Sequence, residues 1–285
     1  MEGISVIITF HGRRKHLINT LRGLENGSLL PEEVILIEMG DKRTELPEFN
    51  FDIKYNLITN SRSNYLPMAR ARNAGAMLSQ FETLAFLDVD CIPAENFIDG
   101  IKKLRSRERA IYMGLPIYLN NDVDGLLSYE DLKKSQEHPG RPCFSNMCKT
   151  DDYGLFWSLC FFMDSTLFFE LGGFDETYTG YGIEDTDLAW KCKHSNVDLY
   201  LTRFKVYHQP HAFQRPPLSN LDSIIRNCNH FYSKWKHWPM QKQLERFKQM
   251  GLIKWDKDQT NCIEILTLPT KAMYESALVL NEPFA

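Results

Sequence analysis

The chain has 285 residues, of which 43% are hydrophobic, and a formal net charge of −4 from 33 basic and 37 acidic residues. This apolar content is enough for a folded core and excludes wholesale disorder, and the slightly acidic balance gives no reason to expect a nucleic-acid partner. The seven cysteines are scattered without any Cys-x-x-Cys pair, so neither a zinc site nor a disulfide framework is predicted.

The first residues form a strand-like run and lack the basic stretch and long apolar stretch of a secretory signal. No window approaches 18 uninterrupted apolar residues, so we expect no transmembrane segment, and peripheral membrane contact stays open. If the chain is the whole natural protein, its expected location is the cytoplasm, where the cysteines would be free thiols.

Strand and helix patterns alternate through the first hundred residues. Apolar runs predict strands at 4–10, 33–38, 55–59 and 83–87, and apolar residues at helical spacing predict helices at 15–24, 68–80 and 97–105. Such alternation predicts a mostly parallel sheet covered by helices on both faces. Ligands of open sheets of this kind bind beyond the carboxyl ends of the strands, so residues far apart in sequence are expected to line one crevice.

The pattern is less regular after residue 109. We expect a strand at 110–118, a polar loop or small helical insertion over 120–148, an apolar aromatic segment at 156–164 and a turn at 171–176. A helix is predicted at 185–194, because acids in its first turn and lysines near its end match the helix dipole. Two short strands (197–201 and 204–208) and two amphipathic helical segments (221–235 and 240–250) follow, and the last thirty residues carry little pattern.

The most informative segment is 84–93, where an apolar run ends in Asp88 and Asp90. In an extended chain residues i and i+2 lie on one face, so both carboxylates would point the same way. Two carboxylates held together repel unless they are protonated or bridged by a cation. A divalent cation that carries a polyphosphate is the expected bridge, since hard cations prefer carboxylate and phosphate oxygens. The alternative is a strand that ends in two solvated acids.

A second pair of acids, Glu184 and Asp185, follows a loop that contains Gly180 and Gly182. Acids are common at helix starts, so the pair could serve the helix alone. The glycines favour a functional reading, because they allow the backbone to approach a ligand closely. A carboxylate at a helix N-terminus stays ionised and suits a general base.

These segments occur in the order seen in GT-A glycosyltransferases, and the chain resembles the family 2 enzymes over roughly three-quarters of its length. The segments that carry the resemblance are 4–14, 68–75, 86–90, 172–175 and 180–187. Over 156–190 the chain is also similar to the carboxyl-terminal portion of galactosyltransferases and bacterial chondroitin-polymerase-type domains.

The resemblance implies an α/β fold of the GT-A type, which is a Rossmann-like nucleotide-diphospho-sugar transferase with a mixed sheet flanked by helices. Residues 1–215 would form the catalytic domain, with a nucleotide-binding half over about 1–109 and an acceptor-binding half over about 110–215. Residues 216–285 would form a C-terminal helical extension. The resemblance also makes a bacterial source the expected one.

Roles for single residues follow from the resemblance as well. It implies that Asp90 is a direct metal ligand, that Asp88 contacts the ribose or metal-bound water in the metal shell, and that His208 completes that shell, with His211 in reserve. Asp185 would be the catalytic base, and Glu184 would contact acceptor hydroxyls or the loop backbone. The residues implied in nucleotide binding are Thr9, Phe10, His11, Arg13, Glu38, Asn60, Arg72 and Asp88.

Two positions within these motifs need comment: the choice between two arginines and a departure from the commoner glycine loop. Arg70 and Arg72 are separated by about 200° around a helix, so only one can face the cleft, and Arg72 aligns better with the family. Ile183 stands where a second glycine is commoner, which bears on the shape of the loop and on the choice of acceptor.

Aromatic residues near the motifs allow two interpretations. Trp157, Phe161 and Phe162 could stack on sugar rings or pack in the core. The tryptophans beyond the resemblance could cover an acceptor groove, but we favour burial of a helical appendage; they are Trp235, Trp238 and Trp255. The polar, proline-bearing segments 120–146 and 208–217 are candidate mobile segments near the site.

The implied function is metal-dependent, inverting transfer of a hexose or N-acetylhexosamine from a UDP-sugar, with Mn²⁺ or Mg²⁺, to a hydroxyl of a glycan, a lipid-linked saccharide or a peptide. A nucleotidyltransferase on a related scaffold is one alternative, although the loop after the first strand has only one glycine, Gly12. The other alternative is a non-catalytic carbohydrate-binding protein, which would have no need of Asp88, Asp90, Asp185 and His208.

Overall fold

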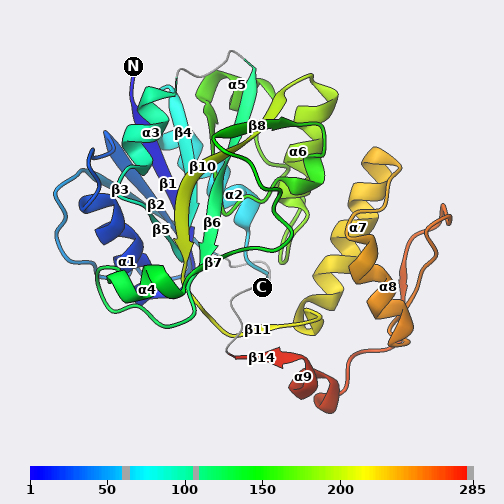
Figure 1. Cartoon of the computed structure of the whole chain (residues 1–285). Coiled ribbons are helices and arrows are strands. Elements are labelled where there is room, and N and C mark those ends of the chain that lie inside the picture. The colour runs from blue at the N-terminus through cyan, green and yellow to red at the C-terminus, as the bar shows by residue number, and fades with distance from the viewer. Residues whose placement is uncertain (60–64, 105–108, 281–285) are drawn as a thin grey trace.

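The computed structural model describes residues 1–59, 65–104 and 109–280 (Figure 1). Within these residues the centre of the molecule is a ten-stranded sheet in the order β3-β2-β1-β4-β9-β6-β10-β5, with β7 paired to β6 and β8 to β10. The strands of this sheet are β1 (Ile4–Phe10), β2 (Glu33–Met39), β3 (Ile53–Ile58), β4 (Thr83–Asp88), β5 (Cys91–Pro93), β6 (Ala110–Tyr118), β7 (Gln136–Glu137), β8 (Met147–Thr150), β9 (Cys160–Asp164) and β10 (Asp198–His208).

The sheet is parallel in its first half and mixed in its second. Strands β3, β2, β1 and β4 run parallel, whereas β9 runs antiparallel to both of its neighbours, β4 and β6. Strand β10 is parallel to β6 and antiparallel to β5. The mixed α/β sheet flanked by helices agrees with the expected fold class.

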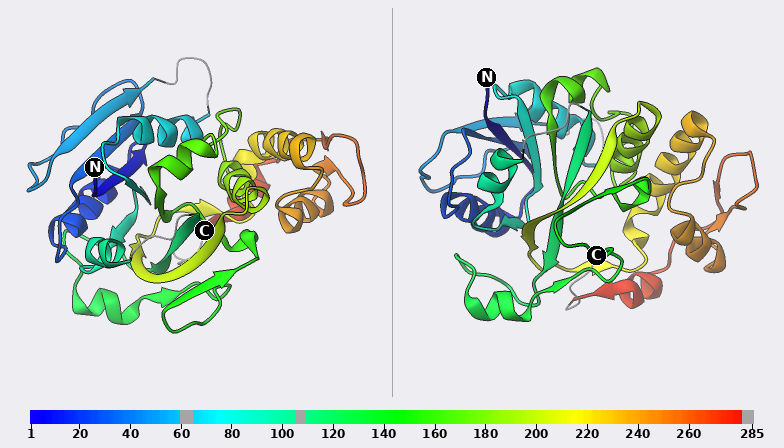
Figure 2. Two further views of the ribbon diagram at one scale, coloured as in Figure 1. Left: turned by 90° about the horizontal axis from the view of Figure 1, so that it is seen from above. Right: turned by 45° about the horizontal axis from the view of Figure 1, so that its top comes forward.

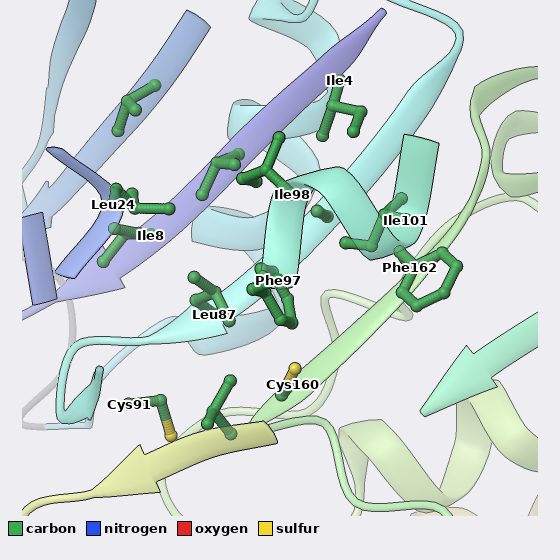
Figure 3. Close-up of a cluster of buried hydrophobic side chains, with 14 of the residues drawn as sticks. Ile4, Ile8, Leu24, Leu87, Cys91, Phe97, Ile98, Ile101, Cys160 and Phe162 are labelled. Atoms are coloured by element: carbon green, nitrogen blue, oxygen red, sulfur yellow. The ribbon is translucent and has the colours of Figure 1, made fainter. Parts of the chain in front are cut away.

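Helices cover both faces of the sheet because successive side chains of each strand point to opposite faces. Ile4, Val6 and Ile8 of β1 join one buried cluster with α1 (Arg14–Glu25) and α3 (Phe97–Lys103). Ile7, on the other face, joins a second cluster with α2 (Met68–Leu78), α5 (Ser165–Glu170) and α6 (Glu184–His194). Figure 3 shows Phe97, Ile98 and Ile101 of α3 pointing toward the strands of the first cluster.

Several elements differ from the expectation. One continuous strand, β10, replaces the two predicted short strands, because both of its halves pair with β6 across a register shift between Leu201 and Lys205. The three-residue strand β5 and the helix α5 were not predicted; α5 begins where the Asp164 side chain accepts a hydrogen bond from the Leu167 backbone N–H. The polar segment after residue 119 contains a short helix, α4 (Tyr129–Lys134), capped by Ser128.

The aromatic segment at 156–164 is largely core. Phe161 and Phe162 are buried, whereas Trp157 is half-buried with the Arg141 guanidinium 3.6 Å from its ring centre. Each of the seven cysteines, all of them in the described part of the chain, is a free thiol. No helix among the described residues is long and apolar enough to span a bilayer.

The C-terminal part has a buried cluster of its own and stands to one side of the sheet (Figure 2). Trp238 and Trp255 are buried in this cluster, as expected for a helical appendage, and Trp235 packs against it. Tyr178 and Ile183, which precede α6, belong to the same cluster. Its elements are α7 (Leu221–Trp235), α8 (Gln241–Gln249) and α9 (Lys271–Ala277), with the short strands β11 (Phe213–Gln214), β12 (Ile253–Lys254), β13 (Glu264–Ile265) and β14 (Leu278–Val279).

Candidate active site

Backbone pairing brings the end of β4 to the end of β10. Thr9 at the end of β1 is in register with Asp88 at the end of β4, and the chain then turns through Asp90 into β5. Because β5 pairs antiparallel with β10, Cys91 lies opposite His208. The Gln209 backbone N–H also donates to the Asp90 carbonyl oxygen at 2.8 Å. These bonds fix Asp90 beside His208, although the two are far apart in sequence.

Asp90 is the centre of a small charged cluster and is only 3% exposed. The Nε2 atoms of His208 and His211 each lie 3.6 Å from one of its carboxylate oxygens, and Arg13 forms an ion pair with it. Burial works to raise the pKa of Asp90, but its interactions with His208, Arg13 and His211 outweigh burial, and the pKa lies below its ordinary value. The carboxylate is therefore held in its charged form.

Asp90, His208 and His211 form a donor set that suits a divalent cation. Their ligand atoms all lie within 4.8 Å of one another. One carboxylate and two imidazoles match the preferences of borderline cations such as Mn²⁺. Among the described residues no hydrogen-bond partner reaches the buried Nδ1 of His208, so this ring carries an unused ligand atom. The sequence ranked His211 second, whereas the structure brings both histidines equally close to Asp90.

Arg72 joins the two acid pairs that the sequence singled out. Its side chain is 4% exposed and donates to Asp88 Oδ1 at 3.1 Å and to Glu184 Oε1 at 2.8 Å. The guanidinium also lies 5.2 Å from the ring centre of Phe174. Arg70, two residues earlier on α2, is exposed, so Arg72 is the arginine that faces inward. Burial raises the pKa of Asp88, with Arg72 opposing that rise.

Glu184 and Asp185 are the first two residues of α6. Burial, followed by the charge of Asp185, raises the pKa of Glu184 to about 7, and Arg72 offsets part of this rise. Asp185 is half-buried and accepts a hydrogen bond from the Thr186 backbone N–H at 2.7 Å. The structure therefore provides two adjacent carboxyl groups with different surroundings, which is a common arrangement where one group must accept a proton.

The backbone ahead of these acids is left-handed. Gly180, Gly182 and Ile183 all have positive φ, with Ile183 at 79°. A β-branched residue rarely adopts this region, at a cost of roughly 1–2 kcal/mol. Ile183 thus keeps the conformation that the glycine of the commoner motif would adopt easily. It is 1% exposed, so its side chain is fixed by packing.

The residues predicted to bind the nucleotide divide into two groups. Arg13 and Arg72 reach the acidic pair, and Thr9 lies beside Asp88 in the sheet. Phe10 is buried in the core, and the Glu38 carboxylate accepts hydrogen bonds from the Thr44 backbone N–H and hydroxyl and from the Tyr55 hydroxyl.

The structure therefore gives Phe10 and Glu38 internal partners and does not direct them to the Asp90 cluster. His11 is exposed, and its Nδ1 contacts the Met39 carbonyl oxygen. Asn60 lies outside the described residues.

A cavity of about 330 Å³ lies against the Asp90 cluster. Its lining includes Arg13, His211, Gln214 and Tyr181 of the glycine loop. A larger cavity of about 750 Å³ lies against α1 and β5, and its described lining includes none of the acids or histidines discussed above. Of these two cavities, the smaller one is lined both by His211 of the donor set and by Tyr181 of the loop before Glu184.

Comparison with known proteins agrees with these motifs. The model of a family described as glycosyltransferase-like family 2 matches residues 5–211. Validoxylamine A glucosyltransferase of Streptomyces hygroscopicus subsp. limoneus is 24% identical over 260 residues, which cover 81% of this chain and 56% of that protein. The protein of the same name from subsp. jinggangensis is 23% identical and is 60% covered. The chain thus spans a little over half the length of these relatives.

Two solved structures resemble the fold. A crystal structure of GalNAc-T7 with UDP, GalNAc and Mn²⁺ superposes with a TM-score of 0.53 at 17% identity, covering 87% of this chain and 54% of that one. A structure of Staphylococcus aureus TarS, residues 1–349, gives a TM-score of 0.52 at 12% identity, covering 88% and 79%. At these identities the likeness concerns the fold alone.

Proposed function

The chain belongs to the glycosyltransferase-like family 2 and has the GT-A fold, and on that premise we propose that it is a metal-dependent, inverting enzyme that uses a UDP-sugar. The donor would supply a hexose or N-acetylhexosamine, and the acceptor would be a hydroxyl of a glycan, a lipid-linked saccharide or a peptide. Family membership favours glycosyl transfer over the nucleotidyltransferase and the non-catalytic alternatives.

One observation carries the proposal. Asp90, His208 and His211 present a compact donor set, and Arg72 connects its neighbour Asp88 to Glu184, next to Asp185. Arg72 thus joins by hydrogen bonds a residue two positions before the candidate cation ligand Asp90 and the residue directly before the candidate base Asp185. We take residues 1–215 as the catalytic domain and 216–285 as its extension.

In the proposed mechanism Asp90, His208 and His211 would hold Mn²⁺ or Mg²⁺, and Asp88 would contact the donor ribose or the metal shell. When bound, the cation would neutralise the diphosphate and the charge that grows on it as the glycosidic bond breaks. Arg13 pairs with Asp90 and lies at the same site, so its guanidinium would be available to bind the diphosphate.

Asp185 then acts as the base. It takes the proton of the acceptor hydroxyl, whose oxygen attacks the sugar from the side opposite the leaving diphosphate. Attack from that side inverts the configuration at the anomeric carbon. Glu184, held by Arg72, would orient the acceptor hydroxyl.

Two variants test these roles separately. Binding of UDP-glucose, UDP-galactose and their N-acetyl forms is measured by thermal shift with and without Mn²⁺, and UDP release is measured with each donor. Asp90→Ala should lose the Mn²⁺-dependent shift. Asp185→Asn should keep the shift but turn over about 10²–10⁴-fold more slowly, the usual contribution of a general base.

The exposed residue Asp122 provides the control, because Asp122→Asn removes a carboxylate that belongs to neither the proposed cation site nor the pair of acids on α6. This variant should behave like the unmodified protein in both assays. Normal turnover by Asp185→Asn would refute its role as base, and an undiminished Mn²⁺-dependent shift in Asp90→Ala would refute the proposed cation site.

A further inference from the structure

Helix α7 of the C-terminal extension holds the loop that precedes the two acids of α6. Asn227 of α7 is 2% exposed, and its side-chain nitrogen lies 3.2 Å from the carbonyl oxygen of Thr179, 3.5 Å from that of Tyr181 and 3.1 Å from that of Gly182. The side-chain amide of Asn227 thus lies within hydrogen-bonding distance of three carbonyl oxygens of the loop. Arg226, its neighbour, donates to the Thr179 carbonyl oxygen at 2.8 Å.

The loop also touches the helix directly. A Cβ atom at Gly180 would lie 2.6 Å from the Cβ atom of Ser223, so no larger residue fits there without movement. The φ of Gly180 is +85°, a conformation that L side chains rarely adopt. The Ser223 hydroxyl accepts a hydrogen bond from the Tyr181 backbone N–H at 3.3 Å. The path of residues 179–182 is therefore fitted to α7.

The strained residue of the loop is buried in the same cluster. Ile183 has its φ at 79° and shares a buried apolar cluster with Ile224 and Cys228 of α7. Strained backbone persists only where the surrounding structure enforces it. Packing of the extension supplies that enforcement here, immediately before Glu184.

A second attachment lies one turn further into α6. Asp187 is fully buried and accepts hydrogen bonds from Lys234 Nζ at 2.8 Å and Trp235 Nε1 at 2.7 Å, both from the last turns of α7. It also accepts one from the Tyr178 hydroxyl at 3.2 Å. The loop and the first turn of α6 are thus held at two places along α7, which stands beside α6 in Figure 1.

We propose that Asn227 is a positioning residue for glycosyl transfer: through the carbonyls of residues 179–182 it sets where Glu184 and Asp185 stand relative to the donor. This inference rests on the proposed function of those two acids. The family match ends at residue 211, so the positioning element lies outside the segment that the family model matches. The active site of this chain is then completed by its extension.

The chain offers a matched control on the same helix. Asn229 donates to the Ile263 carbonyl oxygen at 3.1 Å and accepts from the Ile263 backbone N–H at 2.7 Å, so it binds the C-terminal segment instead of the glycine loop. Asn227→Leu and Asn229→Leu each replace the amide by an apolar side chain of similar volume. The backbone groups that the amide had bound are then left unpaired. Only Asn227→Leu should change the position of Glu184 and Asp185.

Two measurements on the full chain test the inference. Hydrogen exchange followed by mass spectrometry should show exchange over residues 178–184 at least about ten-fold faster in Asn227→Leu, and faster exchange around residue 263 in Asn229→Leu. UDP release with Mn²⁺ and the best donor should show kcat about ten- to a hundred-fold lower in Asn227→Leu, because misplaced reacting groups cost rate. Its donor KM should change less than about two-fold, and Asn229→Leu should keep kcat within that range.

Unchanged exchange over 178–184 in Asn227→Leu would overturn the inference, and so would equal losses of kcat in both variants, since equal losses indicate a general effect of stability. Faster loop exchange with normal kcat would also overturn it. Failure of the proposed function looks different: the unmodified protein would then release no UDP from any donor, and the exchange data alone would decide whether Asn227 holds the loop.

Discussion

Arg72 is the residue on which the geometry of the site depends most. It is buried, and its guanidinium reaches one carboxylate from each acid pair, Asp88 and Glu184. A buried arginine is stable only when such partners compensate for its lost hydration. The arrangement has a cost, because Glu184 is buried next to Asp185 and its pKa is raised to about 7. The site thus keeps a carboxyl group whose charged form is disfavoured by the fold.

We predict that Glu184→Gln stabilises the protein at high pH and lowers its activity. The folded-state pKa of Glu184 lies above the ordinary 4.5, so the folded state binds the proton more tightly and loses stability as pH rises from about 4.5 to about 7. Glutamine mimics the protonated form. The free energy of unfolding of Glu184→Gln should therefore exceed that of the unmodified protein by on the order of 1–2 kcal/mol above pH 7, with no difference near pH 4. Urea unfolding at both pH values measures this difference.

The activity of the same variant should be below that of the unmodified protein above about pH 7 and approach it in acid, where Glu184 is protonated in the unmodified protein. The unmodified enzyme should lose rate as pH falls through about 7, where Glu184 takes up a proton, and Glu184→Gln should lack that limb of the profile. A variant with full activity would contradict a role for the charged carboxylate. Equal stability gains at pH 4 and pH 8 would contradict the assigned pKa.

At the scale of elements, close packing of α2 on the sheet determines how Arg72 reaches the cleft. Gly75 lies one turn after Arg72 on the same helix, and a Cβ atom there would lie 2.4 Å from Ile7 Cγ2 and 3.4 Å from Ile37 Cγ1. The helix can rest on β1 and β2 only because this position has no side chain. The distance of α2 from the sheet then determines how far the Arg72 guanidinium extends into the cleft.

We therefore predict that Gly75→Val destabilises the fold and weakens donor binding. Overpacking of a tight core contact costs about 1–3 kcal/mol, and valine recovers little of it through helix propensity. Met77→Val provides the control, because Met77 is 76% exposed on the same helix. Urea midpoints and the UDP-sugar thermal shift should fall for Gly75→Val alone. Equal behaviour of the two variants would show that the contact with Ile7 has no consequence.

At the scale of the whole molecule, a buried carboxylate also stabilises the sheet. Glu33 on β2 is 2% exposed and binds Lys54 Nζ at 2.5 Å, the Ser5 hydroxyl at 2.6 Å and the Gln80 backbone N–H at 2.7 Å. Burial works against the charge of Glu33, but these partners outweigh it and lower its pKa. The contacts connect β1, β2, β3 and the segment that leads into β4.

Glu33→Gln should accordingly destabilise the protein at neutral pH and matter less in acid. A group whose folded-state pKa is lowered contributes stability above the ordinary value of 4.5 and loses that contribution as pH falls through the folded value. We expect a loss of about 1–3 kcal/mol at pH 7 that shrinks below pH 4. Urea unfolding across pH, with the exposed Glu2→Gln as control, measures it. A loss that is independent of pH would contradict the assignment.

Sequence patterns predicted the parts of the fold that depend on local order. The helix at 221–235 and the strands at 4–10 and 110–118 were expected at the bounds they have, because their apolar spacing is regular. Strand β5 was missed, since three residues show no periodicity, and yet its pairing with β10 brings His208 to Asp90.

Side-chain partners that are far apart in the sequence could not be predicted either, because they also leave no periodic pattern. The bonds from Thr44 and Tyr55 to Glu38, and those from Asn227 to the glycine loop, join residues whose own sequence patterns are unremarkable. The acidic pairs were found because adjacent acids at strand and helix ends are visible in the sequence. The arginine between them was predicted only through the family motif.

The short ladder between β11 and β14 fastens the far end of the chain to the wall of the small cavity. Phe213 and Gln214 pair with Val279 and Leu278, and the Arg215 backbone N–H donates to the Ala277 carbonyl oxygen at 2.8 Å. A ladder with so few hydrogen bonds should open locally far more often than the whole protein unfolds. Displacement of residues 213–215 would require these bonds to break, so the strength of this pairing limits movement of that part of the cavity wall.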